Sequence, residues 1–114
     1  MDNSPALWDL PALRRDGSKY DRGHCVVLGG PAAHTGAARL AARAALRIGA
    51  GLVSIACDPG SLIVYATALE AVMTRVVRSA DAFADLIADR RITALALGPA
   101  AGVTVRTRAI AQAA

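Results

Sequence analysis

The sequence is poor in aromatic side chains and in lysine. One Trp, two Tyr and one Phe make up 4% of the 114 residues, and lysine occurs once among thirteen basic residues. A nucleic-acid surface usually combines a dense basic patch with aromatic side chains that stack on bases. Here the basic residues are scattered, and the only adjacent pairs, Arg14-Arg15 and Arg90-Arg91, have no aromatic neighbour in the sequence. We therefore expect no nucleic-acid partner, despite a formal net charge of +4.

Cysteine is also scarce, and the two cysteines do not form a motif. Cys25 and Cys57 each lie inside an apolar run, and neither a CxxC pair nor a His/Cys metal spacing occurs. The sequence therefore predicts no metal site and favours reduced, buried thiols in the cytoplasm. No apolar run approaches the roughly 18 residues of a membrane span, and the first residues lack the pattern of a signal peptide. We expect neither a membrane partner nor secretion.

Hydrophobic residues are plentiful, at 54%, and they fall into alternating strand and helix patterns. After a polar leading segment over residues 1–22, continuous apolar runs alternate with helical periodicity, which favours a parallel sheet covered on both faces. Predicted strands cover residues 24–30, 52–57, 72–77 and 92–98, and predicted helices cover 36–48, 61–71, 79–91 and 103–114. The pattern over residues 61–71 fits either a helix or a strand, and we favour the helix. The pattern predicts an α/β fold: part of a doubly wound, three-layer α/β/α domain with a mostly parallel sheet.

The predicted helix over residues 36–48 is rich in alanine. Its periodicity places Ala37, Leu40, Ala41, Ala44 and Ile48 on one face, which we expect to pack against the sheet. An arginine at every fourth position forms a stripe that we expect to be solvated. His34 or Thr35 is placed to cap the start of the helix, and Gly49 and Gly51 are expected to end it in left-handed conformations.

Two glycine-rich turns, GGPAAHTG over residues 29–36 and GPAAG over 98–102, each follow a predicted strand. They should therefore lie at the same carboxyl edge of the sheet, where open α/β folds bind ligands. Neither turn fits a P-loop or a dinucleotide fingerprint, because the chain has no Gly-Lys pair and the glycine spacing is wrong. The helix start at Thr35-Gly36 still offers free N–H groups to an anion, so spacing alone leaves binding and purely structural roles open.

No arrangement of side chains indicates a catalytic group. Neither a Ser-His-Asp nor a Cys-His combination is suggested, and His24 and His34 are interpreted as structural and loop residues. Asp58 lies in a predicted turn, and Lys19 is expected to be solvated. We expect no catalytic residue in this chain.

The stretch KYDRGHCVVLGGPAAHTGAARLAARAALRIGAGLVSIA, residues 19–56, resembles the opening of the ADP/ATP-dependent (S)-NAD(P)H-hydrate dehydratase domain, in the ribokinase-like superfamily of α/β enzymes. The matching pieces are the lysine-then-glycine lead, the strand ending in Gly-Gly, the Thr-Gly-Ala-Ala helix start and AALRIGAGLV. Further on, ALALGPAAG is similar to the family's strand followed by Gly-Pro-Gly-Leu-Gly. EAVMTR stands where the family has Pro-Glu-Ala/Val-Met.

The resemblance implies a hydro-lyase that repairs hydrated NADH and NADPH. In that family ADP or ATP phosphorylates the hydroxyl of the hydrate, and loss of phosphate restores the nicotinamide ring. The resemblance therefore implies ADP or ATP as phosphoryl donor with Mg²⁺, and a small-molecule partner. It implies that Ala37 and Gly102 contact the substrate, while Gly29, Gly30, Thr35 and Gly36 shape the same pocket.

The sequence departs from the family in two ways. Ala100 replaces the middle glycine of the Gly-Pro loop, which would weaken binding if that position needs a positive φ. The family's catalytic Leu-Asp-Ala-Asp motif and its nucleotide-binding Lys-Gly loop do not occur in the sequence. We therefore expect residues 1–114 to be the N-terminal part of one dehydratase domain, without its C-terminal half, and inactive alone. A homo-oligomer of the full-length form is left open.

Two alternatives remain at this stage. One is a fragment of another ribokinase-like small-molecule kinase, which the match over residues 35–53 disfavours. The other is a non-catalytic nucleotide-binding or assembly remnant that pairs its open sheet edge with another chain.

Overall fold

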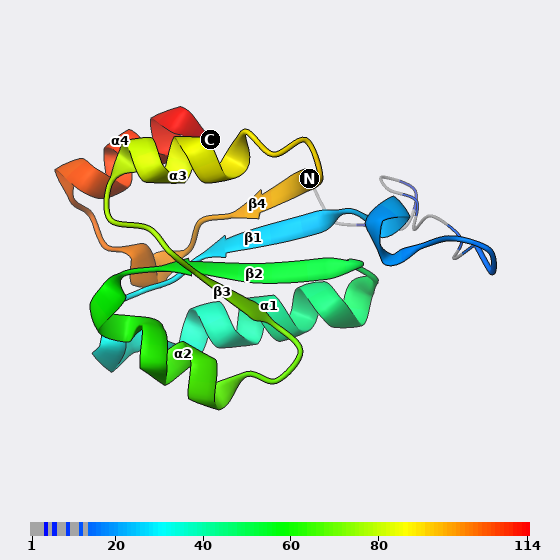
Figure 1. Ribbon diagram of the computed structural model, residues 1–114, viewed down its shortest axis with the longest axis horizontal. Coiled ribbons are helices and arrows are strands. Elements are labelled where there is room, and N and C mark those ends of the chain that lie inside the picture. The colour runs from blue at the N-terminus through cyan, green and yellow to red at the C-terminus, as the bar shows by residue number, and fades with distance from the viewer. Residues whose placement is uncertain (1–3, 5, 7–8, 10–11, 13) are drawn as a thin grey trace.

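A four-stranded parallel sheet lies between two pairs of helices (Figure 1). The computed structural model describes residues 4, 6, 9, 12 and 14–114. The strands are β1 (His24–Leu28), β2 (Leu52–Cys57), β3 (Met73–Val76) and β4 (Ile92–Ala96), in the order β3-β2-β1-β4. The helices are α1 (Gly36–Ile48), α2 (Leu62–Ala68), α3 (Ala80–Ile87) and α4 (Val105–Ala113), with short 3₁₀ turns between several elements. All three strand pairs are parallel, which confirms the predicted α/β class.

The helices cover opposite faces of the sheet. Helices α1 and α2 lie on one side, where Val27, Ile55 and Tyr65 belong to one core cluster. Helices α3 and α4 lie on the other side, where Phe83 and Ile110 pack with residues of β1 and β2. The two central strands are therefore buried on both faces, which explains their continuous apolar sequences. The outer strands β3 and β4 are only partly covered.

All eight predicted helices and strands are present, and most are shorter than predicted. The strands expected over residues 24–30 and 92–98 end at Leu28 and Ala96, so the glycines that follow belong to loops. Ser79 caps α3 by accepting a hydrogen bond from the Ala82 amide, at 3.1 Å. Thr35 precedes α1, but its side chain makes no capping hydrogen bond. The predicted leading segment lies partly outside the described residues, and its described part includes a 3₁₀ turn, Lys19–Arg22.

The predicted buried face of α1 is wrong. Leu40 and Ile48 are each 70% exposed, and Ala37 and Ala44 are also exposed. The residues that face the sheet are instead Ala38, Ala42, Ala45 and Leu46, with Ala41 at the boundary. Alanine occurs on every side of this helix, so periodicity fits two stripes equally well. The smaller side chains pack inward because they bring the helix axis close to the sheet.

The arginine stripe of α1 is solvated as predicted for two of its members. Arg43 and Arg47 are exposed, while Arg39 is half-buried. The stripe therefore needs no ligand to explain it.

The two glycines after α1 serve different purposes. Gly49 has φ of 120°, the left-handed conformation expected at the end of a helix. Gly51 was expected to be left-handed as well, and this prediction is wrong, because the positive-φ glycines are Gly23, Gly49 and Gly102. Gly51 lies against the backbone carbonyl of Lys19, where a Cβ atom would overlap that oxygen. Its role is close packing of two backbone segments.

Cys57 is buried, as predicted, whereas Cys25 is only half-buried, and both are free thiols. Burial raises the pKa of both thiols above the ordinary cysteine value, which keeps them protonated and unreactive. Within the described part of the chain, no helix is both long enough and apolar enough to cross a membrane.

Candidate functional site

A cavity of about 1030 Å³ opens at the carboxyl edge of the sheet. The loop after β1, the start of α1, the loop after β4 and the first turns of α4 form its walls. The prediction that both glycine-rich turns meet at one sheet edge is therefore confirmed. Ligands of open α/β folds bind at this edge, which makes the cavity the candidate site.

Four of the six residues proposed for the substrate pocket line this cavity: Gly29, Gly36, Ala37 and Gly102. None of these carries more than a methyl group, so the wall presents backbone and open space. The first N–H groups of α1 have no acceptor within the helix and are therefore free to bind a polar ligand group. The remaining two residues, Gly30 and Thr35, are buried behind the wall.

Gly30 is the point where the two loops touch. A Cβ atom built on Gly30 would lie 2.6 Å from the carbonyl oxygen and 2.8 Å from the Cβ of Ala100. No non-glycine residue in the described part of the chain has a positive φ, so alanine is tolerated at position 100 without backbone strain. The replacement at position 100 is therefore compatible with the loop, and Gly30 provides the room that it requires.

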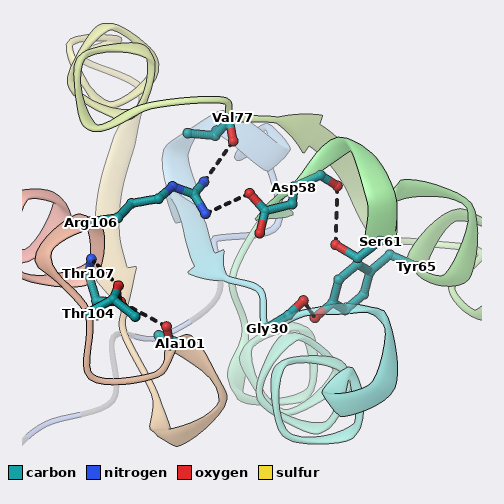
Figure 2. A network of polar contacts seen from close by, with 9 residues as sticks. All are labelled: Gly30, Asp58, Ser61, Tyr65, Val77, Ala101, Thr104, Arg106 and Thr107. Atoms are coloured by element: carbon teal, nitrogen blue, oxygen red, sulfur yellow. Dashed lines mark hydrogen bonds and ion pairs between the residues drawn. The ribbon is translucent and has the colours of Figure 1, made fainter.

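Tyr65, on α2, supports the loop after β1. Its side chain is fully buried, and its hydroxyl donates a hydrogen bond to the Gly30 carbonyl at 3.1 Å (Figure 2). Burial raises the pKa of the Tyr65 hydroxyl, although the hydrogen bond to Gly30 acts in the opposite direction. Tyr65 therefore remains a neutral donor that fixes the position of Gly30.

Arg106 joins three elements across the cavity wall (Figure 2). It extends from the first turn of α4, and its Nη1 forms an ion pair with the Asp58 Oδ1 at 2.6 Å. Its Nη2 donates to the Val77 carbonyl at 2.8 Å. Because Asp58 follows β2 and Val77 follows β3, one side chain links α4 to the ends of two strands. Both Arg106 and Asp58 line the cavity.

Thr104 caps the start of α4, and Thr107 connects this helix to the preceding loop. The Thr104 Oγ1 accepts a hydrogen bond from the Thr107 amide at 3.1 Å. The Thr107 hydroxyl in turn donates to the Ala101 carbonyl at 2.8 Å, which ties the loop after β4 to the helix (Figure 2). These bonds hold Gly102, with its positive φ of 77°, at the cavity.

Few ionisable side chains line the described part of the cavity. His34 lies on an exposed part of the lining, and Asp58 is the one carboxylate among the described lining residues. Mg²⁺ prefers several oxygen ligands, whereas the Asp58 carboxylate is already paired with Arg106. No group of three or more His, Cys, Asp or Glu side chains in the described part of the chain could hold a metal ion. The residues present therefore do not form a Mg²⁺ site.

Sequence reasoning missed Asp58, Tyr65 and Arg106. Asp58 was interpreted as a turn residue, and Arg106 received no role. A signal for Arg106 was present, because a positive side chain in the first turn of a helix is disfavoured by the helix dipole and needs a compensating partner. Its partner is 48 positions away, so the signal could not identify it.

Comparison with known proteins identifies the family of this chain. The sequence profile of the family described as NAD(P)H-hydrate dehydratase matches residues 25–114. The bifunctional NAD(P)H-hydrate repair enzyme of Coxiella burnetii is 37% identical over 93 residues, which cover 82% of this chain and 19% of that protein. The ATP-dependent (S)-NAD(P)H-hydrate dehydratase of Ixodes scapularis is 34% identical over 93 residues, covering 82% and 29%. The chain thus spans less than a third of these relatives.

Solved structures agree on the fold. A ribokinase-like superfamily protein from Enterococcus faecalis superposes with a TM-score of 0.72 at 19% identity, covering 90% of this chain and 36% of that one. A hypothetical protein from Streptococcus mutans gives a TM-score of 0.70 at 21% identity, with 90% and 38% covered. These likenesses identify part of a ribokinase-like α/β fold. With the family profile matching most of its length, the chain belongs to the NAD(P)H-hydrate dehydratase family.

Proposed function

We propose that this chain supplies the substrate-binding wall of an NAD(P)H-hydrate dehydratase, in which hydrated NADH or NADPH is returned to the intact dinucleotide at the expense of ADP or ATP. The observation that carries the proposal is the convergence of two separate family-like loops on one cavity. Ala37, in the first turn of α1 directly after the first loop, and Gly102, in the second loop, both line it.

The small side chains of the wall suit a flat, polar ring. Gly29, Gly36, Ala37 and Gly102 let a nicotinamide-type ring approach the backbone, whose N–H groups can bind its carboxamide or hydroxyl oxygens. The buried Tyr65 holds Gly30, and through it the shape of the loop. The role proposed for these residues is to bind and orient the hydrate.

The phosphoryl transfer is a separate requirement. A bound ADP or ATP would supply the phosphoryl group that the hydroxyl of the hydrate needs in order to leave. The described residues offer neither a Mg²⁺ site nor a positioned general base. We therefore propose that the 114 residues alone bind the hydrate without converting it.

Titration calorimetry with hydrated NADH tests the binding proposal. Ala37→Leu should weaken binding by about tenfold or more, because the added side chain fills the cavity. Ala44→Leu is the matched control, since Ala44 is exposed on the same helix and does not line the cavity. Equal effects of the two substitutions, or no binding by the unmodified chain, would overturn the proposal.

Turnover is tested separately. Hydrated NADH is incubated with the chain, ADP or ATP, and Mg²⁺, and the return of NADH absorbance is followed. We expect no return above the rate without protein. Turnover that depends on the chain would contradict the statement that these residues only bind.

A further inference from the structure

The charge in the candidate cavity is concentrated in one place. Asp58 and Arg106 are the charged residues of its described lining, and His34 is the one other ionisable side chain there. A dinucleotide carries at least two negative charges on its pyrophosphate. A ligand of that class would therefore meet a cationic side chain at a single point of the described lining, Arg106.

The guanidinium of Arg106 is held in place and still has hydrogen-bond capacity. Its five N–H donors form a planar fork that suits phosphate oxygens. One donor of Nη1 is directed to Asp58 and one of Nη2 to Val77. Its Nε is buried and has no hydrogen-bond partner among the described residues. The Arg106 side chain as a whole is 38% exposed, so the second N–H groups of Nη1 and Nη2 can donate to a ligand oxygen while the guanidinium keeps its contacts with Asp58 and Val77.

The position of Arg106 on α4 favours the same kind of ligand. Arg106 follows Thr104, the capping residue of α4, by two positions, so the positive end of the helix dipole lies beside it. That placement is unfavourable for an arginine unless negative charge is nearby. Asp58 supplies part of this charge at 2.6 Å, and the phosphate of a ligand would supply more.

We propose that Arg106 binds a phosphate group of the ligand and that Asp58 and the Val77 carbonyl hold its guanidinium ready. The inference rests on the proposed function for the identity of the cavity, and it adds the group that recognises the phosphate. Asp58 restrains Arg106 and also competes with the ligand for it. Removing only the charge of Asp58 should therefore strengthen phosphate binding.

The test compares ligands that differ by one phosphate. Nicotinamide riboside and nicotinamide mononucleotide are titrated into the 114-residue chain, and the ratio of their dissociation constants is measured. We expect the mononucleotide to bind about tenfold more tightly, the effect of one charge-assisted contact. In Arg106→Met this preference should fall below about twofold, and Arg106→Lys should restore part of it.

Two further variants separate recognition from structure. Asp58→Asn keeps an amide oxygen that can accept from Nη1 but loses the charge, so the preference for the phosphorylated ligand should rise by about twofold or more. Arg108→Met removes a neighbouring exposed arginine of α4 that does not line the cavity, and it should leave the ratio unchanged. If Arg106 were only structural, its replacement would weaken both ligands by the same factor and the ratio would stay at its original value.

The outcomes distinguish this inference from the proposed function. A chain that binds hydrated NADH but shows no preference for phosphate overturns the inference alone. A chain that prefers the phosphorylated ligand but does not bind hydrated NADH retains the inference and overturns the proposed function. If Arg106→Met fails to fold by circular dichroism, the ratios for Arg106→Lys and Asp58→Asn still decide, and an unchanged ratio in both overturns the inference.

Discussion

The edge of the sheet where the parallel strands begin (the amino edge) and the edge where they end (the carboxyl edge) are held together in different ways. At the amino edge, backbone packs on backbone: Gly51 lies against the Lys19 carbonyl, and the amides of Gly51 and Leu52 both donate to the Gly23 carbonyl at 3.1 Å. At the carboxyl edge, long side chains connect the loops, and Arg106 and Tyr65 reach across. Backbone packing leaves no room for adjustment, whereas side chains can change partners. A substitution at Gly51 should therefore cost more stability than the loss of one side-chain contact at the carboxyl edge.

The largest effect should come from breaking the amino edge. Gly51→Ala places a Cβ atom on the backbone carbonyl group of Lys19, in the 3₁₀ turn Lys19–Arg22, so that turn and the loop before β2 would have to move apart. We expect a loss of about 2–4 kcal/mol in the free energy of unfolding, measured by urea denaturation. Gly60→Ala is the control, because nothing lies within 4 Å of a Cβ there, and it should change stability by less than about 0.5 kcal/mol. Equal stability of the two variants would refute the contrast between the edges.

A smaller effect should follow from removing one support of the carboxyl edge. Tyr65→Phe deletes the hydroxyl that donates to Gly30 and leaves the buried carbonyl without this donor. The expected cost is about 1–1.5 kcal/mol of unfolding free energy, with some loss of affinity for hydrated NADH. The exposed Tyr20 provides the control, since Tyr20→Phe should leave both quantities unchanged. A Tyr65→Phe protein as stable as the parent would show that this bond does not hold the loop.

The smallest effect concerns charge at the amino edge. His24 is buried, and its Nε2 lies 2.8 Å from the Ser54 Oγ. Burial lowers the pKa of His24 below its ordinary value near 6.5, and the charge of Arg75 adds to this, while Asp89 opposes it. The unfolded chain therefore binds more protons just below pH 6.5. Stability should be complete above that pH and should fall as the pH drops through the folded-state value.

Denaturation midpoints measured between pH 5 and 8 test the role of His24. His24→Gln should reduce the change of the midpoint with pH in the acid part of this range. His34→Gln, at an exposed position, should leave the change of the midpoint with pH as it is in the parent chain. An unchanged slope in His24→Gln would assign the pH dependence to other groups. Asp89 titrates outside the range, because its hydrogen bonds to Arg91 lower its pKa to about 2.

Local sequence patterns predicted the helices and strands. The features that they did not predict depend on contacts between residues far apart in the sequence. The bounds of α1 were predicted correctly because Thr35 and Gly49 flank it, and those of β2 because Gly51 and an Asp-Pro-Gly turn flank it. The buried face of α1 could not be predicted, since alanine on all sides leaves the choice to packing. The reason for Gly51 lies at Lys19, 32 positions earlier, and the partner of Arg106 lies 48 positions away.

The charge distribution was also only partly predictable. The pair Arg90-Arg91 has no aromatic neighbour in the sequence, yet the guanidinium of Arg91 lies 6.0 Å from the ring centroid of Tyr20. The fold brings together groups that the sequence separates. The expectation that the chain binds no nucleic acid stays a prediction, and its premise that the basic pairs lack aromatic neighbours holds only along the chain.

The contact between Gly30 and Ala100 constrains how this protein can evolve. A Cβ atom at position 30 would lie 2.6 Å from the Ala100 carbonyl oxygen and 2.8 Å from both the Ala100 Cβ and the His34 carbonyl oxygen. Because two of these three atoms belong to the backbone, replacing Ala100 with glycine would not open room for a side chain at position 30. Glycine is therefore the residue that position 30 accepts, whatever side chain stands 70 positions later in the other loop.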